Sequence, residues 1–286
     1  MTLIAILLAL LLERALSYSP RWRAHDLTGR WMQLIDARVP PGRWSLGLYL
    51  APPLLLLALV LLWWAPQAGN LVSLVLATIL LLACLGPRDL GEEINAYLRA
   101  RRESRQQDAD AMLSHLLTGP CRAEASPIGR SAVAAAFVQG HERWLAVLLW
   151  FFVLGGLGAV AYRMVSAIAC HLRETGADTT LTLRAEWCHG LLAWPTARIT
   201  VLLYALAGST EHAFSSWRRW QQGYQGGWSQ DPWPLLANVG CASLGSDPDE
   251  VADDDSRLAA ALALVTRSLM ILLAVLAVFT LGGWLN

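Results

Sequence analysis

The stretch SLGLYLAPPLLLLALVLLWWAPQAGNLVSLVLATILLLACLG, Ser45 to Gly86, decides the fold class of this chain. It contains two apolar segments without a charged residue, at 45–65 and 70–86, separated by the short turn PQAGN. Because about 20 apolar residues in a helix cross the hydrocarbon core of a bilayer, the stretch predicts a transmembrane hairpin. Pro52 and Pro53 predict a kink in its first arm.

The composition of the whole chain agrees with a membrane protein. Of the 286 residues, 55% are hydrophobic and 15% are charged, and the mean hydropathy is +0.42. A soluble domain normally carries more charge and less apolar surface. All 22 cationic residues are arginine, and 22 acidic residues balance them, so nothing indicates nucleic acid as a partner. The absence of lysine excludes a Walker-type phosphate loop and a Schiff-base lysine.

Arginines on both sides of the hairpin place both of its flanks in the cytoplasm by the positive-inside rule. The flanking arginines are Arg21, Arg23, Arg30, Arg38 and Arg43 before it, and Arg88, Arg99, Arg101, Arg102 and Arg105 after it. Two further apolar stretches, at 144–161 and 269–284, have about the length of a membrane helix. The N-terminal run Thr2 to Leu12 is shorter, and we expect it to be a retained anchor buried among the other helices.

These patterns predict an all-α, polytopic helical membrane protein with four to five membrane helices, short intramembrane or interfacial helices, and cytoplasmic amphipathic helices. We expect a single membrane-embedded domain over residues 1–286. Its parts are the hairpin 45–86, a polar helical segment 87–143, a glycine-interrupted span 144–161, a polar or cleft segment 162–266 and a C-terminal span 267–286. Within the polar helical segment, apolar residues recur at helical intervals and predict one or two amphipathic helices: Ile94, Leu98, Met112 and Leu116.

The segment AWPTARITVLLYALAGSTEHAFSSWRRW, Ala193 to Trp220, supplies most of the candidate binding residues. Its apolar run is only about half a bilayer long and Pro195 favours a helix start, so we expect a helix packed inside or beside the bundle rather than a crossing. Arginine grips carboxylates and phosphates with paired hydrogen bonds, and tryptophan covers flat apolar surfaces. The predicted lining of a polar cleft is Arg163, Trp194, Arg198, Glu211, His212 and Trp217. The alternative is that Arg198 and Glu211 simply pair.

No catalytic residue and no metal site is predicted. The chain has no GxSxG, HExxH or CxxC motif. The dipeptides Cys170-His171 and Cys188-His189 lack the ligand spacing of zinc sites, and the acidic run Ser246 to Asp255 lacks that of calcium loops. The charged run His141-Glu142-Arg143 lies next to an apolar span. Charged side chains at membrane depth cost free energy, so the run indicates either an interfacial ion pair or a functional role.

Two ordered blocks resemble the CobD/CbiB and AmpE superfamily of bacterial inner-membrane proteins. One is the P-x-x-R unit at Pro195, followed by LYALAG and then by Glu211, Phe214 and Trp217. The other is FVQGHERWLAVLLWFFVLGGLGAVAYRM, Phe137 to Met164, which is similar to the superfamily's apolar span with its glycine pair and its tyrosine followed by a basic residue. The start MTLIAILLALLLER and the apolar C-terminal end resemble AmpE proteins in particular.

The resemblance leaves two functional readings. CobD/CbiB enzymes join an amino-alcohol phosphate to adenosylcobyric acid, and they carry a glutamate, an asparagine and a serine-aspartate-glycine cluster where this chain has Gln139 to Arg143. The departure favours an AmpE-like regulatory or sensory protein of the bacterial inner membrane, linked to β-lactamase induction and antibiotic resistance. It would bind a muropeptide or nucleotide-like molecule without catalysis or cofactor, with peptidoglycan-recycling proteins as possible partners. The alternative is an amide-forming synthase at the membrane face that uses ATP and magnesium.

Overall fold

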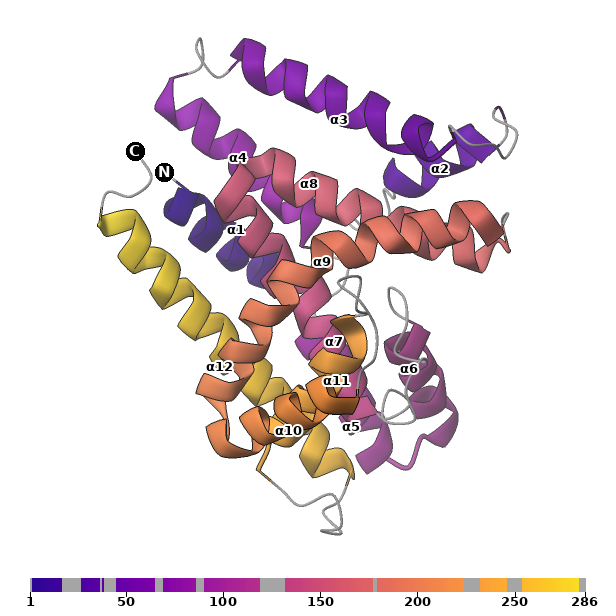
Figure 1. Ribbon diagram of the computed structural model, residues 1–286, viewed down its shortest axis with the longest axis vertical. Helices are drawn as coiled ribbons and strands as arrows, with labels where there is room; N and C mark the ends of the chain where they lie inside the picture. Colours follow the sequence, from indigo (N-terminus) through magenta and orange to yellow (C-terminus); the bar gives the residue numbers. More distant parts are fainter. Residues whose placement is uncertain are drawn as a thin grey trace. The chain divides into compact units, whose positions relative to one another are not determined.

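The computed structural model describes residues 2–16, 27–36, 38, 45–64, 69–85, 90–118, 132–176, 179–223, 232–245 and 254–282 (Figure 1). In these ranges the regular structure is helical and contains no strand, which confirms the predicted all-α class. The chain divides into two compact units. Unit 1 comprises Met1–Pro87 and Val147–Leu192, and unit 2 comprises Arg88–Ala146 and Ala193–Asn286. The expected single membrane-embedded domain stays a prediction.

Four helical stretches are long and apolar enough to cross a membrane among the residues that the structure describes: Leu46–Trp63, Ala132–Glu174, Thr179–Ala207 and Asp255–Leu281. This number agrees with the predicted polytopic fold. Two shorter apolar helices accompany them, α1 (Thr2–Leu16) and α4 (Asn70–Cys84). At 15 residues each, both are about 22 Å long and shorter than the hydrocarbon core.

Unit 1 contains the two arms of the predicted hairpin as α3 (Ser45–Trp64) and α4, of which α3 alone reaches spanning length, so the second crossing stays a prediction. Most of the apolar side chains of α3 are exposed, as a helix surrounded by lipid requires, and Pro52 and Pro53 lie inside it. Helix α2 (Leu27–Asp36) lies beside α3, and the Trp31 indole donates to the Tyr49 carbonyl at 3.0 Å. Helix α1 packs on α4 with one face and exposes the apolar side chains of its other face. The N-terminal run is therefore buried on one side only, rather than among several helices as expected.

One continuous helical stretch is formed by α7 (Ala132–Gly140), the π-helical turn His141–Leu145 and α8 (Ala146–Glu174). The glycine interruption predicted in it is confirmed, because Gly155 has φ 65° and ψ −154° and breaks the helix with a kink. These angles are accessible essentially to glycine alone. Gly156 permits a close approach in the same unit, since a Cβ there would lie 2.9 Å from Leu80 Cδ1 of α4.

The expectation for Ala193 to Trp220 is wrong about where the helix begins. Helix α9 runs over 29 residues from Thr179 to Ala207, and Pro195 lies inside it. The apolar run from Ile199 was too short to cross, but the helix also includes the mixed sequence before Pro195 and reaches spanning length. Proline is tolerated within membrane helices. A separate helix, α10 (Thr210–Gly223), carries the rest of the segment.

In unit 2, α7 is the central element. It packs against α11 (Pro232–Ser243) and α12 (Asp254–Leu281), and both contacts depend on a missing side chain. A Cβ on Gly240 would lie 2.4 Å from the Phe137 ring, and one on Gly140 would lie 2.5 Å from Val265. The predicted amphipathic segment forms α5 (Leu90–Arg102) and α6 (Gln106–Thr118), as expected. Of the acidic run, only Asp254 and Asp255 fall within the described residues, at the start of α12.

Replacing Gly155 by alanine should lower the free energy of unfolding by about 1–3 kcal/mol, because an L-residue is strained at this φ and ψ. Empty space surrounds the position, so the loss would come from the backbone alone. Gly190→Ala is the matched control, since Gly190 lies within α9 of the same unit, also has open space around it and has no positive φ. There alanine should be neutral or stabilising by up to about 1 kcal/mol. Denaturant titration of the protein in detergent measures both, and equal effects would contradict the strained backbone.

Candidate functional site

The π-helical turn His141–Leu145 places three consecutive ionisable side chains inside unit 2. The backbone N–H of Ala146 donates to the carbonyl of His141, five residues earlier, which widens the helix by one residue. His141, Glu142 and Arg143 are 0%, 1% and 8% exposed. Buried charges are costly unless they are paired and hydrogen-bonded. Single π-turns inside α-helices are frequent at functional sites, which makes this turn the candidate site.

Arg143 is held by two residues of unit 2. Its Nη1 donates to Glu93 Oε2 at 2.7 Å, and its Nε donates to Gln139 Oε1 at 3.0 Å. The side chains of Arg143 and Glu93 are only 10% and 18% exposed, so solvent screens this ion pair weakly. Glu93 comes from the first turn of α5. The pair therefore fixes a polar helix to the π-turn of an otherwise apolar one.

His141 connects the same turn to α9 and α11. Its Nδ1 lies 2.9 Å from Thr200 Oγ1, and Thr200 is fully buried on α9. The ring of Trp233 lies 6.1 Å from the imidazole, centroid to centroid. One turn earlier along α7, the Tyr204 hydroxyl donates to the Phe137 carbonyl at 2.7 Å. We call the set around the π-turn the buried polar cluster, and it consists of Glu93, Gln139, His141, Glu142, Arg143 and Thr200.

The buried polar cluster combines the group types that ligand binding and proton transfer use. A guanidinium binds phosphate and carboxylate, while imidazole and carboxylate groups exchange protons. It does not offer a metal site: among the residues that the structure describes, no three His, Cys, Asp or Glu side chains gather in a way that could hold a metal ion. The groups of the cluster are therefore suited to binding anions and transferring protons.

Two of the predicted cleft residues, Trp194 and Arg198, contact each other on α9. The Arg198 guanidinium carbon lies 3.8 Å from the centroid of the Trp194 ring, a cation–π contact between residues one helical turn apart. Both side chains are half-buried. Arg163 lies on α8 in unit 1, whereas the other five predicted residues lie in unit 2.

The three remaining predicted residues lie on α10. Glu211 is exposed in its first turn. The Nδ1 atom of His212 lies 2.7 Å from Oγ of Ser209, the residue just before the helix. The half-buried Trp217 stacks on Phe214 with ring centroids 6.2 Å apart. The predicted binding role of these residues stays a prediction, as does the alternative pairing of Arg198 with Glu211.

Sequence reasoning flagged His141 to Arg143 but missed the residues that hold them. Glu93 lies beside Ile94 on a helix predicted to be amphipathic, and Thr200 lies within an apolar run. One signal was available in each case. Glu93 is three residues after the fully buried Leu90, and Thr200 is four residues after the buried Thr196, so both share a buried helix face.

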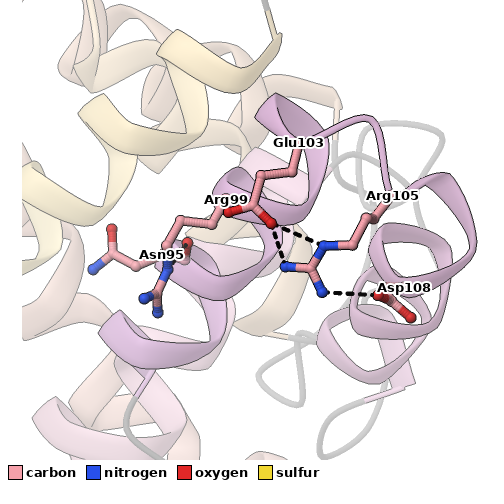
Figure 2. Close-up of polar contacts among 5 residues, drawn as sticks. All are labelled: Asn95, Arg99, Glu103, Arg105 and Asp108. Carbon is pink, nitrogen blue, oxygen red and sulfur yellow. Dashed lines mark hydrogen bonds and ion pairs between the residues drawn. The ribbon is translucent and has the colours of Figure 1, made fainter.

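The turn between α5 and α6 is a contrasting charged group at the surface (Figure 2). Arg105 donates from Nε and Nη2 to Glu103 and from Nη1 to Asp108, at 2.9, 2.6 and 3.0 Å. The hydrogen bond and charge of Glu103 raise the pKa of Arg105. More than half of each of these side chains is exposed, so the pairs add little stability. This part of the predicted amphipathic segment is therefore a solvated face.

Comparison with known proteins places the geometry in context. A family model described as CobD/Cbib protein matches residues 6–231. A curated protein of Chromobacterium violaceum, named cobalamin biosynthesis protein CobD, is 27% identical over 251 residues, which cover 83% of this chain and 78% of that protein. A protein of the same name from Stutzerimonas stutzeri is 27% identical over 202 residues, which cover 69% of this chain and 58% of that protein. No solved structure matches.

These similarities contradict the expected AmpE-like role. The regulatory reading, with its links to β-lactamase induction, signalling, antibiotic resistance and peptidoglycan recycling, is wrong, because both relatives are named for cobalamin biosynthesis. The error came from treating the departure of residues 139–143 from the acidic pattern of the synthases as evidence against the ligase. In the structure these residues are buried, and Arg143 binds the carboxylate of Glu93 from another helix.

Replacing Arg143 by methionine should lower the free energy of unfolding by about 3–5 kcal/mol, because it leaves the Glu93 carboxylate without its cation. The double variant Glu93→Met, Arg143→Met should recover most of the loss, since no charge then stays behind. Arg105→Met removes two exposed ion pairs from the same unit and serves as the matched control, with a much smaller change expected. Denaturant titration in detergent compares the three. An equal loss for Arg143→Met and Arg105→Met would contradict the assigned burial.

Proposed function

Because the chain belongs to the CobD/CbiB family, a family of cobalamin-biosynthesis enzymes, we propose that it forms an amide bond between an amino-alcohol phosphate and a corrinoid acid at the membrane face. The observation that carries the proposal is that the region matching the family contains every member of the buried polar cluster. The chain also covers 78% of the Chromobacterium relative, so the similarity extends through most of a protein with that name.

The proposed reaction joins a carboxyl group to a primary amine and consumes ATP. ATP donates its γ-phosphoryl group to the carboxylate oxygen and leaves as ADP. The amine nitrogen then bonds to the acyl carbon, the acyl–oxygen bond breaks to release inorganic phosphate, and a base accepts the proton of the amine. The protein must therefore hold anionic groups in register and keep competing water away. Magnesium would enter with the nucleotide, where the phosphates and one or two carboxylates hold it.

We assign Arg198 to the anionic substrate. A guanidinium held over an aromatic ring keeps its N–H donors at its edge, where a phosphate or carboxylate meets them in pairs. The contact with Trp194 at 3.8 Å fixes the guanidinium in this way. Thr200, two residues further along α9, is bound to His141, so the buried polar cluster holds the helix that presents Arg198. Arg143 and His141 are then positioning residues.

The proposed location is the bacterial cytoplasmic membrane, with several crossings. Four helices of spanning length support a membrane protein. The C-terminal end of α5 carries Arg99, Arg101 and Arg102, and such arginine-rich ends face the cytoplasm. The ion pair of Arg101 with Asp255 at 3.3 Å ties the start of α12 to the same end. The cytoplasm is also where ATP and a soluble amino-alcohol phosphate are available to the enzyme.

The purified full-length protein, given ATP, magnesium, adenosylcobyric acid and the amino-alcohol phosphate, should release ADP and yield the amide, detected by mass spectrometry. Arg198→Lys should lower kcat/KM at least about tenfold, mainly through a higher KM for the phosphate substrate, because lysine provides no planar pair of donors. Arg102→Gln, an exposed change in the same unit, should leave both constants unchanged.

Two outcomes would contradict different parts of this proposal. If folded wild-type protein yields no amide and no ADP, the proposed reaction is wrong. If wild-type protein is active and Arg198→Lys has unchanged constants, the reaction stands and the role of Arg198 is wrong.

A further inference from the structure

Helix α10 has two different faces. It packs on α11 through Ala213 and Ser216, and the Ser216 hydroxyl donates to the Asn238 carbonyl at 3.3 Å. Away from α11 it exposes Phe214, whose ring stacks on Trp217 and is 43% exposed, and two consecutive arginines, Arg218 and Arg219. A helix with aromatic and cationic residues on its open side has the composition of an interfacial membrane helix.

The chain places the start of α10 at the edge of the membrane. Helix α9 is one of the candidate spans and ends at Ala207, with Leu202 and Leu206 of its last turns 42% and 65% exposed. Arg267 of α12 donates to the Ala207 carbonyl at 3.5 Å, and it is the last charged residue before the apolar run 268–281 of that helix. Arginines that border an apolar run reach to the headgroup layer. Ala207 therefore marks the boundary of the apolar core.

The turn between α9 and α10 is too short and too tightly held to carry α10 away from this boundary. Thr210 follows Ala207 by three residues, which span at most about 10 Å. The N–H of Ser209 donates to the Ser243 carbonyl at 2.8 Å, and a Cβ on Gly208 would lie 2.2 Å from that same oxygen. The headgroup layer is about 5–8 Å thick on each side of the bilayer. Helix α10 thus begins within or next to that layer.

The charge of the open side selects anionic lipid. Glu211 is the one acidic residue of α10, against Arg218 and Arg219. Within the described ranges, no ion pair involves either arginine, whereas Arg101, Arg105, Arg143 and Arg173 each pair with a carboxylate. A protein partner would cover Phe214 as well, but the preceding helix α9 is a candidate span and exposes Leu202 and Leu206 in its last turns, which favours lipid.

We propose that α10 lies in the headgroup layer and binds anionic phospholipid, with Arg218 and Arg219 on the phosphates and Phe214 inserted beside them. The negative surface potential of an anionic leaflet attracts juxtamembrane arginines. The inference rests on the position of α10 in unit 2 and does not depend on the proposed reaction. It gives the enzyme a lipid contact three residues from the end of α9, the helix that carries Arg198.

The test uses the full-length protein in detergent, with phosphatidylglycerol or phosphatidylcholine of identical acyl chains added. Phosphatidylglycerol should raise the Tm of wild-type protein by several degrees more than phosphatidylcholine does, and 0.5 M salt should remove most of the difference. The variant R218Q/R219Q should lose at least half of that difference while keeping its Tm in phosphatidylcholine. The matched control R99Q/R102Q removes two exposed arginines of α5 and should keep the whole difference.

Three results would overturn the proposal. The first is an equal Tm of wild-type protein in the two lipids. The second is an equal loss in R218Q/R219Q and R99Q/R102Q, which would make the effect one of net charge. The third is a fall in the Tm of R218Q/R219Q in phosphatidylcholine that accounts for the whole loss, which would make the two arginines structural. Inorganic phosphate at the same concentration should give no shift, and a shift equal to that of phosphatidylglycerol would indicate a site for free anions.

Discussion

The ion pair between Arg143 and Glu93 is the contact on which the arrangement of unit 2 depends. A stretch long and apolar enough to span a membrane carries three ionisable residues in a row, and burial of such residues is tolerated only where partners meet them. The partner of Arg143 comes from α5 and that of His141 from α9. Both helices must therefore approach the π-turn. Gly140 lets α12 approach α7 closely, and Gly240 lets α11 do the same, because a side chain at either position would collide with the neighbouring helix.

Features of the fold that depend on local sequence patterns could be predicted from the sequence, whereas contacts between residues far apart in the chain could not. The all-α class, the broken span at Gly155 and the two amphipathic helices depend on local periodicity, length and glycine, and all were predictable. The length of α9 was not predictable in this way, because the prediction used the length of the apolar run alone, whereas the helix also includes the mixed sequence before that run. The partners of Arg143 and His141 were not either, since Glu93 is 50 residues and Thr200 is 59 residues away along the chain. Local patterns carry no information about such pairings.

The choice between the two branches of the superfamily shows the same limit. Five residues, Gln139 to Arg143, differ from the acidic pattern of the synthases and favoured a protein without catalysis. Besides Glu142 of this segment, the structure locates a second carboxylate at this place, contributed by Glu93 from α5. A motif compared along one segment cannot register a charge that arrives from another helix. Similarity to two CobD proteins, over 83% and 69% of the chain, is the stronger guide because it weighs the whole framework that positions the site.

The central claim is that this framework, with its buried polar cluster, serves cobalamin biosynthesis. Its most direct test is growth of a bacterial strain that lacks its own CobD/CbiB family gene, under conditions where growth requires cobalamin. The account predicts that this chain restores growth, and that a variant in which Glu93 and Arg143 are both methionine reaches the membrane in normal amount but restores growth poorly. A failure of the unaltered chain to restore growth, at normal abundance in the membrane, would contradict the account.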